Sequence, residues 1–553
     1  MTMRATRASL AVLAAALCLT SAMRAQGART TSDVAPDDWL TYNRTYTGDR
    51  FSPLAQITSS NVAQLRPVCT FDTGEKVSFQ SGPIVVGGVM YVTTDTVTYA
   101  VDAATCALKW KQAHQDGPTA LQVNRGAAYA GGRLFRGAGN GHVIALDAAS
   151  GTPIWDVQVS PTHAGMTIPM APLAWNGLVF VGNAGGDVFG VTGHVWALDQ
   201  KDGHTVWRFD TVPESGPARA SWRNAAGVPI TGGAFWTTFA IDPQDGVLFV
   251  PAGNPAPDFV PDARPGENLY TNSVIAIDAK TGALLQYTQL VKNDYHDWDV
   301  SAGPALITTR GGRRIVASAN KDGLLSALDR SRVRTTSPKS QVPSPKSQVP
   351  SPKSQMPLLY QSPITTRDNI DAKLSADAPI HFCPGTQGGA EWNGPAYDRT
   401  RNLLYVGATD WCTSVQVVRT DALTGRAGGF FSGAVQGFGT LDPIEKSKGW
   451  LTAFDADTGA MRWKYSSRLP MVAGVTPTAG GVVFTGELNG DAIALDAQSG
   501  RELWRHATGN AIGGGVVTYR AGGKQLVAVV AGFKSNVWRA PGESNRVVVY
   551  GLP

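Results

Sequence analysis

One eleven-residue pattern recurs along the chain and constrains its fold more than any other feature. The pattern is Ala-x-Asp-x-x-(Thr/Ser)-Gly-x-x-x-Trp, and its clear copies lie at residues 145–155, 453–463 and 494–504. A further copy at residues 197–207 carries Asp202 before its glycine. A pattern repeated this often indicates one structural unit used many times over.

Looser copies show the spacing of the unit. In residues 100–110 Cys106 replaces the glycine, residues 276–286 have lost the tryptophan, and Ala327 begins a copy that is then interrupted. Trp110 and Trp155 lie 45 residues apart, and Trp463 and Trp504 lie 41 residues apart. A period of about 40–50 residues is typical of the blades of a β-propeller.

The segments between the copies predict short strands. Residues 83–92, 177–182 and 481–486 are β-branched or aromatic runs bounded by glycine. A single four-stranded blade cannot bury both of its faces, so neighbouring blades must stack and the ring must close. The Asp-x-x-x-Gly turn and the tryptophan four residues beyond it can fasten each blade to the next. We therefore predict an all-β fold, a propeller of four-stranded antiparallel blades with Trp docking motifs; the length fits eight blades, with seven as the alternative.

Composition and charge exclude other classes of protein. Only 16% of the residues are charged, while 62 are glycine and 15 are tryptophan, which argues against a helical bundle or a disordered chain. The net charge is +5, and three arginines in the first 25 residues account for all but +2. Since no basic cluster remains, we expect no nucleic-acid partner.

The N-terminus predicts export. Arg4 and Arg7 precede a nearly all-apolar run at residues 10–19, and small residues then offer cleavage after Ala22 or Ala25. Residues 1–25 are therefore interpreted as a signal peptide of a periplasmic protein. No later segment is apolar enough to predict a membrane span.

The remaining residues, 26–553, are expected to form a single propeller domain. Within it, Ser-Pro-Lys-Ser-Gln-Val/Met-Pro occurs three times in tandem at residues 337–357. Its proline content and lack of an apolar period predict a solvated, low-complexity loop.

Four cysteines lie outside the leader, namely Cys69, Cys106, Cys383 and Cys412. Export favours disulfides, and three pairings are open. Proximity in the sequence favours Cys69–Cys106 and Cys383–Cys412. The sequence contains no CxxC and no CxxCH, so it encodes neither a zinc ribbon nor an attached c-type haem.

Several segments resemble a known family. The likeness starts at Asp-Trp-Leu-Thr-Tyr (38–42), continues through Arg-Phe-Ser-Pro-Leu (50–54) and ends near residues 523–529. The chain resembles the pyrroloquinoline quinone (PQQ)-dependent alcohol dehydrogenases, eight-bladed quinoproteins that bind PQQ and usually a calcium ion on the propeller axis. The likeness covers nearly all of the chain after the leader, except the Ser-Pro-Lys repeats.

The resemblance implies a set of cofactor-binding residues. Val-Asn-Arg-Gly at 123–126 matches the family's VNRG, so Arg125 is expected to bind a PQQ carboxylate. Trp236 matches the tryptophan on which the PQQ ring stacks, and it lies outside the repeat. Gln80, Lys321 and Trp392 match further cofactor positions. The alternatives are a surface ion pair for Arg125 and a core-filling role for Trp236.

The resemblance also implies a calcium site. Asn254, in Gly-Asn, matches the family's amide ligand, and Asp187 stands where the family has a glutamate. Calcium prefers several oxygen ligands, ideally with carboxylates, and Asp299 is a third candidate. A hydrogen-bonded turn is the structural alternative for Asp187 and Asn254.

Tyr-His-Asp-Trp-Asp-Val at residues 295–300 is the candidate catalytic segment. The family's general base is an aspartate after a tryptophan, in a longer motif than this one. Asp299 is the first choice for the base; Asp297 is the alternative, or else orients Asp299 or binds calcium. An acidic turn without function is the remaining interpretation. One departure is Thr119-Ala120, where many members carry adjacent cysteines.

Taken together, the resemblance implies oxidation of an alcohol by hydride transfer to PQQ, with electrons passing to an external acceptor such as a soluble c-type cytochrome. Two alternatives stay open. One is an aldose-oxidising quinoprotein of the same fold, and the other is a non-catalytic propeller scaffold of the outer-membrane assembly type.

Overall fold

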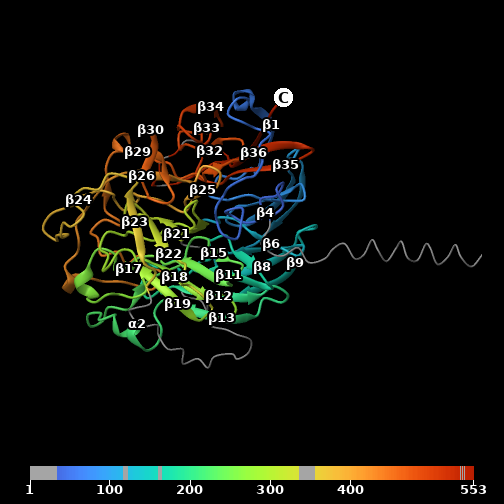
Figure 1. Ribbon diagram of the computed structural model, residues 1–553. Coiled ribbons are helices and arrows are strands. Elements are labelled where there is room, and N and C mark those ends of the chain that lie inside the picture. The colour runs from blue at the N-terminus through green and yellow to red at the C-terminus, as the bar shows by residue number, and fades with distance from the viewer. Residues whose placement is uncertain are drawn as a thin grey trace, which may run out of the picture.

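The chain forms a ring of antiparallel β-sheets. The computed structural model describes residues 34–115, 122–159, 165–335, 355–535, 537–538, 540, 542 and 544–553. Within these residues there are eight four-stranded sheets (Figure 1). Seven sheets pair their four strands in chain order, and the eighth is completed by a strand from the N-terminal part. The prediction of eight blades is confirmed, and the seven-bladed alternative is wrong.

The first four blades consist of β2 (Ile84–Val86), β3 (Val89–Thr93), β4 (Val97–Asp102), β5 (Leu108–Ala113); β6 (Ala128–Ala130), β7 (Arg133–Gly137), β8 (His142–Asp147), β9 (Pro153–Gln158); β10 (Leu173–Trp175), β11 (Leu178–Gly182), β12 (His194–Asp199), β13 (Thr205–Asp210); and β15 (Ala240–Asp242), β16 (Val247–Pro251), β18 (Ser273–Asp278), β19 (Leu284–Gln289).

The last four blades consist of β20 (Ala305–Thr308), β21 (Arg314–Ala319), β22 (Leu324–Asp329), β23 (Leu358–Pro363); β25 (Ala396–Asp398), β26 (Leu403–Asp410), β29 (Lys448–Asp455), β30 (Met461–Ser467); β31 (Thr476–Pro477), β32 (Val482–Gly486), β33 (Asp491–Asp496), β34 (Glu502–Ala507); and β35 (Val516–Ala521), β36 (Lys524–Ala531), β37 (Arg546–Gly551), β1 (Arg66–Asp72).

Smaller elements lie outside the eight blade sheets, in the segments that precede or connect their strands. They are the β14–β17 pair (Thr231–Gly232, Pro255–Ala256), the sheet of β24 (Ile380–Phe382), β27 (Thr413–Val415) and β28 (Thr440–Leu441), the helix α2 (Pro217–Ala220), and the 3-10 turns η1 (Val62–Gln64), η2 (Pro261–Ala263), η4 (Thr420–Ala422) and η5 (Ile444–Lys446). No helix among the described residues is long and apolar enough to cross a bilayer.

Antiparallel pairing decides where the long loops lie. Because strand direction reverses at every step, the loop after the second strand of a blade and the link into the next blade lie at the same end of the ring. The turns after the first and third strands, including the Asp-x-x-x-Gly turns, lie at the opposite end. Insertions in the first set of loops therefore gather at one end of the molecule.

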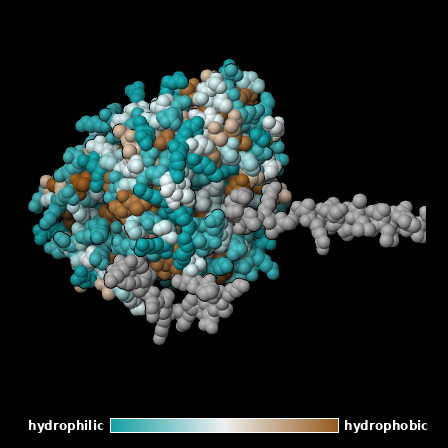
Figure 2. Space-filling model, in the orientation of Figure 1, coloured by the Kyte–Doolittle hydropathy of each residue, from teal (hydrophilic) through white to brown (hydrophobic). Residues whose placement is uncertain are grey.

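The apolar cores lie between the blades. One core combines Val92 of the first blade with Val517 and Leu526 of the last, and two further cores likewise span adjacent sheets. The fourth strands are partly exposed at the rim, as the alternating exposure of β5 and β9 shows. On the face drawn in Figure 2 the surface is mostly hydrophilic, with hydrophobic atoms in scattered patches.

Where a blade carries the repeat tryptophan, this residue connects it to the next blade, as the sequence predicts. The Trp110 Nε1 donates to the Ala148 carbonyl at 3.2 Å, and the Trp155 Nε1 donates to the Gln200 carbonyl at 3.1 Å. The indole of Trp110 packs on Gly151, where a Cβ would lie 2.5 Å from the ring and φ is +75°. Only glycine satisfies both the left-handed turn and the close approach.

Tyr360 completes the interrupted copy. It pairs with Ala327 across β22 and β23, as Trp155 pairs with Ala145 in the second blade. Its hydroxyl donates to the Ala456 carbonyl of the following blade at 2.9 Å. The Ser-Pro-Lys insertion therefore lies inside the outer hairpin of the fifth blade, and it leaves the docking contact in place with tyrosine as the aromatic residue.

The end of the Ser-Pro-Lys repeat differs from the sequence-based expectation. Residues 336–354 lie outside the described residues, but Met356 is only 1% exposed and packs in the core between blades four and five. Pro357 accepts a hydrogen bond from the Asp329 amide, next to the start of β23. The predicted solvated loop to residue 357 is therefore wrong at Met356, because this apolar side chain belongs to an inter-blade core.

A disulfide takes the place of the tryptophan contact where the ring closes. The N-terminal strand β1 pairs with β37 and completes the last blade. Figure 1 labels β1 near β35 and β36 of the same blade. Cys69 occupies the tryptophan position of this blade, Cys106 occupies the glycine position of the first blade's turn, and the two are bonded. Both predicted disulfides are confirmed, the second being Cys383–Cys412.

We expect the double variant Cys69→Ser/Cys106→Ser to weaken the closure of the ring. The cross-linked cysteines are 37 residues apart, so the loss in unfolding free energy should be about 4 kcal/mol. Hydrogen exchange should accelerate first in β1 and β37. In the control Cys383→Ser/Cys412→Ser, exchange in β1 should stay at the wild-type rate; equal protection of β1 in both variants would contradict this role.

Candidate active site

A cavity of about 760 Å³ opens at the end of the ring that carries the long loops. All the cofactor, metal and catalytic residues predicted from the sequence line it, namely Gln80, Arg125, Asp187, Trp236, Asn254, Asp297, Asp299, Lys321 and Trp392. They come from eight different blade-to-blade links or second-to-third-strand loops. Antiparallel geometry brings these loops together, although the residues span more than 300 positions of sequence.

Trp236 and Arg125 form one wall. Trp236 lies between β14 and β15, is partly buried, and presents its ring to the cavity. The Arg125 guanidinium lies over this ring at 4.9 Å from its centroid and donates to the Trp236 carbonyl at 3.1 Å. From the sequence, the alternative role for Arg125 is an ion pair at the surface. This alternative is wrong, because the side chain is buried and faces aromatic rings.

Trp392 and Trp538 form an adjoining aromatic wall. Their rings meet edge to face with centroids 6.4 Å apart, and the Trp392 Nε1 donates to the Gly513 carbonyl. Arg125 also lies 5.4 Å from the Trp392 ring centroid. Gln80 lines the same region, and its buried Oε1 has no hydrogen-bond partner among the described residues. A buried polar atom without a partner indicates a place for a ligand.

Lys321 holds the two candidate catalytic aspartates. Its Nζ donates to Asp297 Oδ2 at 2.8 Å and to Asp299 Oδ2 at 3.3 Å, and all three side chains are buried. Although burial alone lowers it, the charges of Asp297 and Asp299 hold the pKa of Lys321 well above its usual range. Lys321 is therefore a fixed positive charge at the floor of the cavity.

Asp299 contacts the edge of the Trp236 indole. Its Oδ1 accepts from the Trp236 Nε1 at 3.4 Å and from the backbone N–H of Asn254 at 3.0 Å. Gly253 makes room for this carboxylate, since a Cβ there would lie 2.4 Å from the same oxygen. Asp299 is therefore held by donors on both of its oxygens.

Asp297 lies on the other side of Lys321. Its backbone has a φ of +65°, an uncommon left-handed conformation for a residue other than glycine. Burial, together with the neighbouring carboxylates, raises the pKa of Asp297 well above its ordinary value, although Lys321 opposes the shift. The two aspartates thus differ in their partners, which the sequence alone does not show.

A group of three carboxylates lies beside this pair. Ligand oxygens of Asp187, Asp258 and Asp297 all lie within 4.8 Å of one another. The Asn254 Nδ2 donates to Asp258 Oδ1 at 3.0 Å, so the predicted amide borders the group. Burial and the charge of Asp299 raise the pKa of Asp187 to about 6. Asp299 is not in this group, and its role as a metal ligand stays a prediction.

Two acidic residues were missed by sequence reasoning. Asp258 follows Asn254 by four residues, and Glu391 directly precedes Trp392. Burial raises the pKa of Glu391 to about 8, while Lys321 and Arg125 oppose the shift, and its Oε1 has no hydrogen-bond partner among the described residues. Their positions next to predicted site residues were the available signal; burial, which the sequence does not give, marks them as unusual.

Comparison with known proteins agrees with this geometry. Residues 39–378 match the family model of the PQQ glucose/ethanol/alcohol dehydrogenase β-propeller domain. The chain belongs to the family of PQQ-dependent alcohol dehydrogenases. A second model, named for the outer membrane protein assembly factor BamB, matches residues 447–549.

Individual relatives cover almost the whole chain. The dehydrogenase subunit of the quinone alcohol dehydrogenase of Gluconacetobacter polyoxogenes is 30% identical over 91% of this chain and 72% of its own length. Subunit 1 of the methanol dehydrogenase [cytochrome c] of Paracoccus denitrificans is 28% identical, covering 90% of this chain and 83% of its own. The structure of the quinohemoprotein alcohol dehydrogenase of Comamonas testosteroni superposes with a TM-score of 0.79 at 26% identity, covering 96% and 82% of the two chains.

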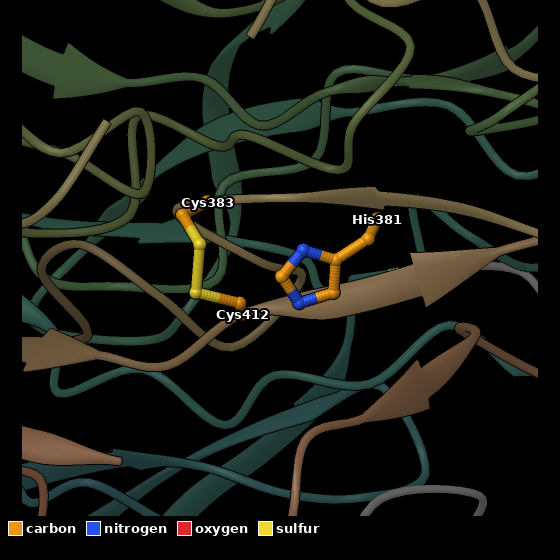
Figure 3. A group of neighbouring side chains, drawn as sticks. All are labelled: His381, Cys383 and Cys412. Carbon is orange, nitrogen blue, oxygen red and sulfur yellow. A yellow bond between two sulfur atoms is a disulfide. The ribbon is translucent and has the colours of Figure 1, made fainter. Parts of the chain in front are cut away.

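In this PQQ-dependent dehydrogenase, a disulfide secures the loop that carries Glu391 and Trp392. Figure 3 shows Cys383 bonded to Cys412 beside His381. Because both sulfurs are in the disulfide, the cluster offers no thiolate to a metal. His381 instead contacts Asp442 at 3.2 Å. The departure at Thr119-Ala120 lies outside the described residues.

We expect Glu391→Gln to change how stability depends on pH. Because the pKa of Glu391 is raised from 4.5 to about 8, its contribution to stability is present below pH 4.5 and is lost as pH rises to about 8. The difference in unfolding free energy, wild type minus variant, should therefore fall across this window in cofactor-free protein. Denaturant titrations at several pH values measure it; the exposed Glu445→Gln is the control, and a pH-independent difference would contradict the assignment.

Proposed function

We propose that this chain is a PQQ-dependent dehydrogenase that oxidises an alcohol by hydride transfer to PQQ. The observation that carries the proposal is the pairing of Asp297 and Asp299 on Lys321 at the edge of Trp236, in one cavity with Arg125. A carboxylate next to the Trp236 ring and the fixed cation Lys321 suits abstraction of a proton from a hydroxyl group. The family and its alcohol-oxidising relatives support the same chemistry.

The cavity residues fit PQQ. Its planar ring suits the face of Trp236, with Trp392 and Trp538 as the neighbouring wall, and its carboxylates suit Arg125. The unpartnered Gln80 Oε1 and Glu391 Oε1 offer further polar contacts. Since the Arg125 guanidinium covers the Trp236 ring in the structure, stacking of the cofactor on that face requires the guanidinium to move aside.

The acidic side of the cavity fits a calcium ion. We propose that Asp187 and Asn254 are ligands, with Asp299 close by, as the family motif suggests. Oxygen donors with several carboxylates are the ligand set that calcium prefers. When bound, PQQ supplies the two-electron acceptor and calcium supplies a Lewis acid.

Asp299 is proposed as the general base that takes the hydroxyl proton. It lies at the Trp236 edge, whereas Asp297 makes the shorter bond to Lys321 and so orients the pair. Lys321 donates to both carboxylates and so holds the two side by side. Asn254 and Trp236 fix the direction of the Asp299 carboxylate by donating to its Oδ1.

The scaffold alternative is less well supported. The match to the BamB model covers residues 447–549, which include the last blades but, of the predicted site residues, none. That likeness therefore concerns the blade repeat. Oxidation of an aldose sugar uses the same site, so glucose belongs among the substrates to be tested.

We further propose export to the periplasm through residues 1–25 and electron transfer to a soluble c-type cytochrome. The arginine-led apolar leader supports export. The absence of CxxCH from the sequence and the cytochrome in the name of the Paracoccus relative support an external acceptor.

Reconstitution with PQQ and Ca²⁺ tests the enzyme proposal. We expect reduction of an artificial dye with short primary alcohols, and Asp299→Asn should retain PQQ while kcat falls about 10²–10⁴-fold. Asp297→Asn should lower kcat less. Full activity of Asp299→Asn with the loss appearing in Asp297→Asn would exchange the two roles, and turnover on glucose alone would favour the sugar alternative.

Substitution of Trp236 tests stacking of the cofactor on its ring. Trp236→Ala should lose PQQ on gel filtration, since the flat surface under the ring is removed, whereas Trp236→Phe should retain part of it. Absorbance of bound PQQ after separation measures this. Equal PQQ content in wild type and Trp236→Ala would place the cofactor elsewhere.

A further inference from the structure

The carboxylate of Asp258 is completely buried, and only one of its two oxygens accepts a hydrogen bond from the described residues. Its side chain is 0% exposed, Oδ1 accepts from Asn254, and Oδ2 has no hydrogen-bond partner among the described residues. The oxygens of Asp187 and Asp297 lie within 4.8 Å of it in the three-carboxylate group. A buried carboxylate oxygen without a donor is costly unless a ligand completes it.

The buried Arg264 does not supply a donor to this carboxylate. The Arg264 Nε donates to the Pro257 carbonyl, and its Nη2 donates to the Asp258 carbonyl, both at 3.0 Å. Arg264 therefore fixes the two peptide groups that precede and follow the Cα of Asp258. The guanidinium makes no hydrogen bond to the Asp258 carboxylate, which stays directed at the other two acids.

The charges of the site are not balanced by protein groups. Lys321 donates to Asp297 and Asp299, but in the described part of the chain no hydrogen bond or ion pair joins a cationic side chain to the carboxylate of Asp187 or of Asp258. Like charges this close repel strongly in a partly desolvated site. A hard cation among the three carboxylates would remove the repulsion and satisfy Oδ2.

We propose that Asp258 is a direct ligand of the metal ion, together with Asp187, Asp297 and the side-chain amide of Asn254. The inference rests on the proposed function only for the presence of a metal in this cavity. It assigns to this chain a carboxylate ligand that the motifs did not reveal. It also leaves Asp299, outside the group, available as a base.

Metal binding by the cofactor-free protein tests the proposal without using activity. In calorimetric titration with Ca²⁺, Asp258→Asn should bind at least about tenfold more weakly than wild type, since a charged ligand is lost. With Tb³⁺ as a luminescent probe, lifetimes in H₂O and D₂O should report about one additional bound water in the variant. Asp262→Asn, an exposed residue of the same loop, should match wild type.

Thermal stability separates a ligand from a structural residue. Without metal, Asp258→Asn should have a Tm equal to or above that of wild type, because an amide removes a charge from the acidic group and adds a donor. The gain in Tm on adding Ca²⁺ should be smaller in the variant. A lower metal-free Tm with an unchanged Ca²⁺-dependent gain would overturn the proposal.

The remaining outcomes distinguish this inference from the proposed function. If wild type and Asp258→Asn bind Ca²⁺ equally and hold equal numbers of water molecules on Tb³⁺, the inference fails whatever the activity. If wild type binds neither ion, it fails as well. If binding depends on Asp258 while the protein neither holds PQQ nor oxidises alcohols, the ligand assignment stands and the proposed function fails.

Discussion

The structure depends on the contact between an aromatic ring of one blade and the glycine turn of the next. A four-stranded blade leaves apolar faces uncovered, and the ring closes only when every neighbour is fixed at the right angle. The indole on Gly151 and its equivalents supply both a flat apolar contact and a hydrogen bond. At the junction of the last blade with the first, the same two positions are Cys69 and Cys106, so a covalent bond replaces the aromatic contact next to β1, the strand that closes the ring.

This arrangement separates stability from chemistry. The Asp-x-x-x-Gly turns face one end of the ring, and the loops that contain Arg125, Trp236 and Asp299 face the other. Insertions at the second end, including the β14–β17 pair, shape the cavity without altering the docking contacts. The Ser-Pro-Lys insertion is tolerated for a related reason, since it leaves the contact of Tyr360 with the next blade intact.

The cavity concentrates charge that the fold itself does not neutralise. Lys321 pairs with Asp297 and Asp299, while Asp187, Asp258 and Glu391 have raised pKa values because burial and like charges disfavour ionisation. A protein selected only for stability would have no use for such a group. The cost in free energy is understandable when a cation and an anionic cofactor bind there.

The sequence by itself determined the repeat unit, favoured eight blades and both disulfide pairings, and named through family motifs many residues of the cavity. These features follow from local patterns, because a turn, a strand and a docking aromatic recur at a fixed spacing. The sequence did not distinguish the roles of Asp297 and Asp299, and it did not reveal Asp258, Glu391 or the burial of Met356. Those were decided by the tertiary structure, since burial and the distance between charges depend on how loops from different blades meet across the axis.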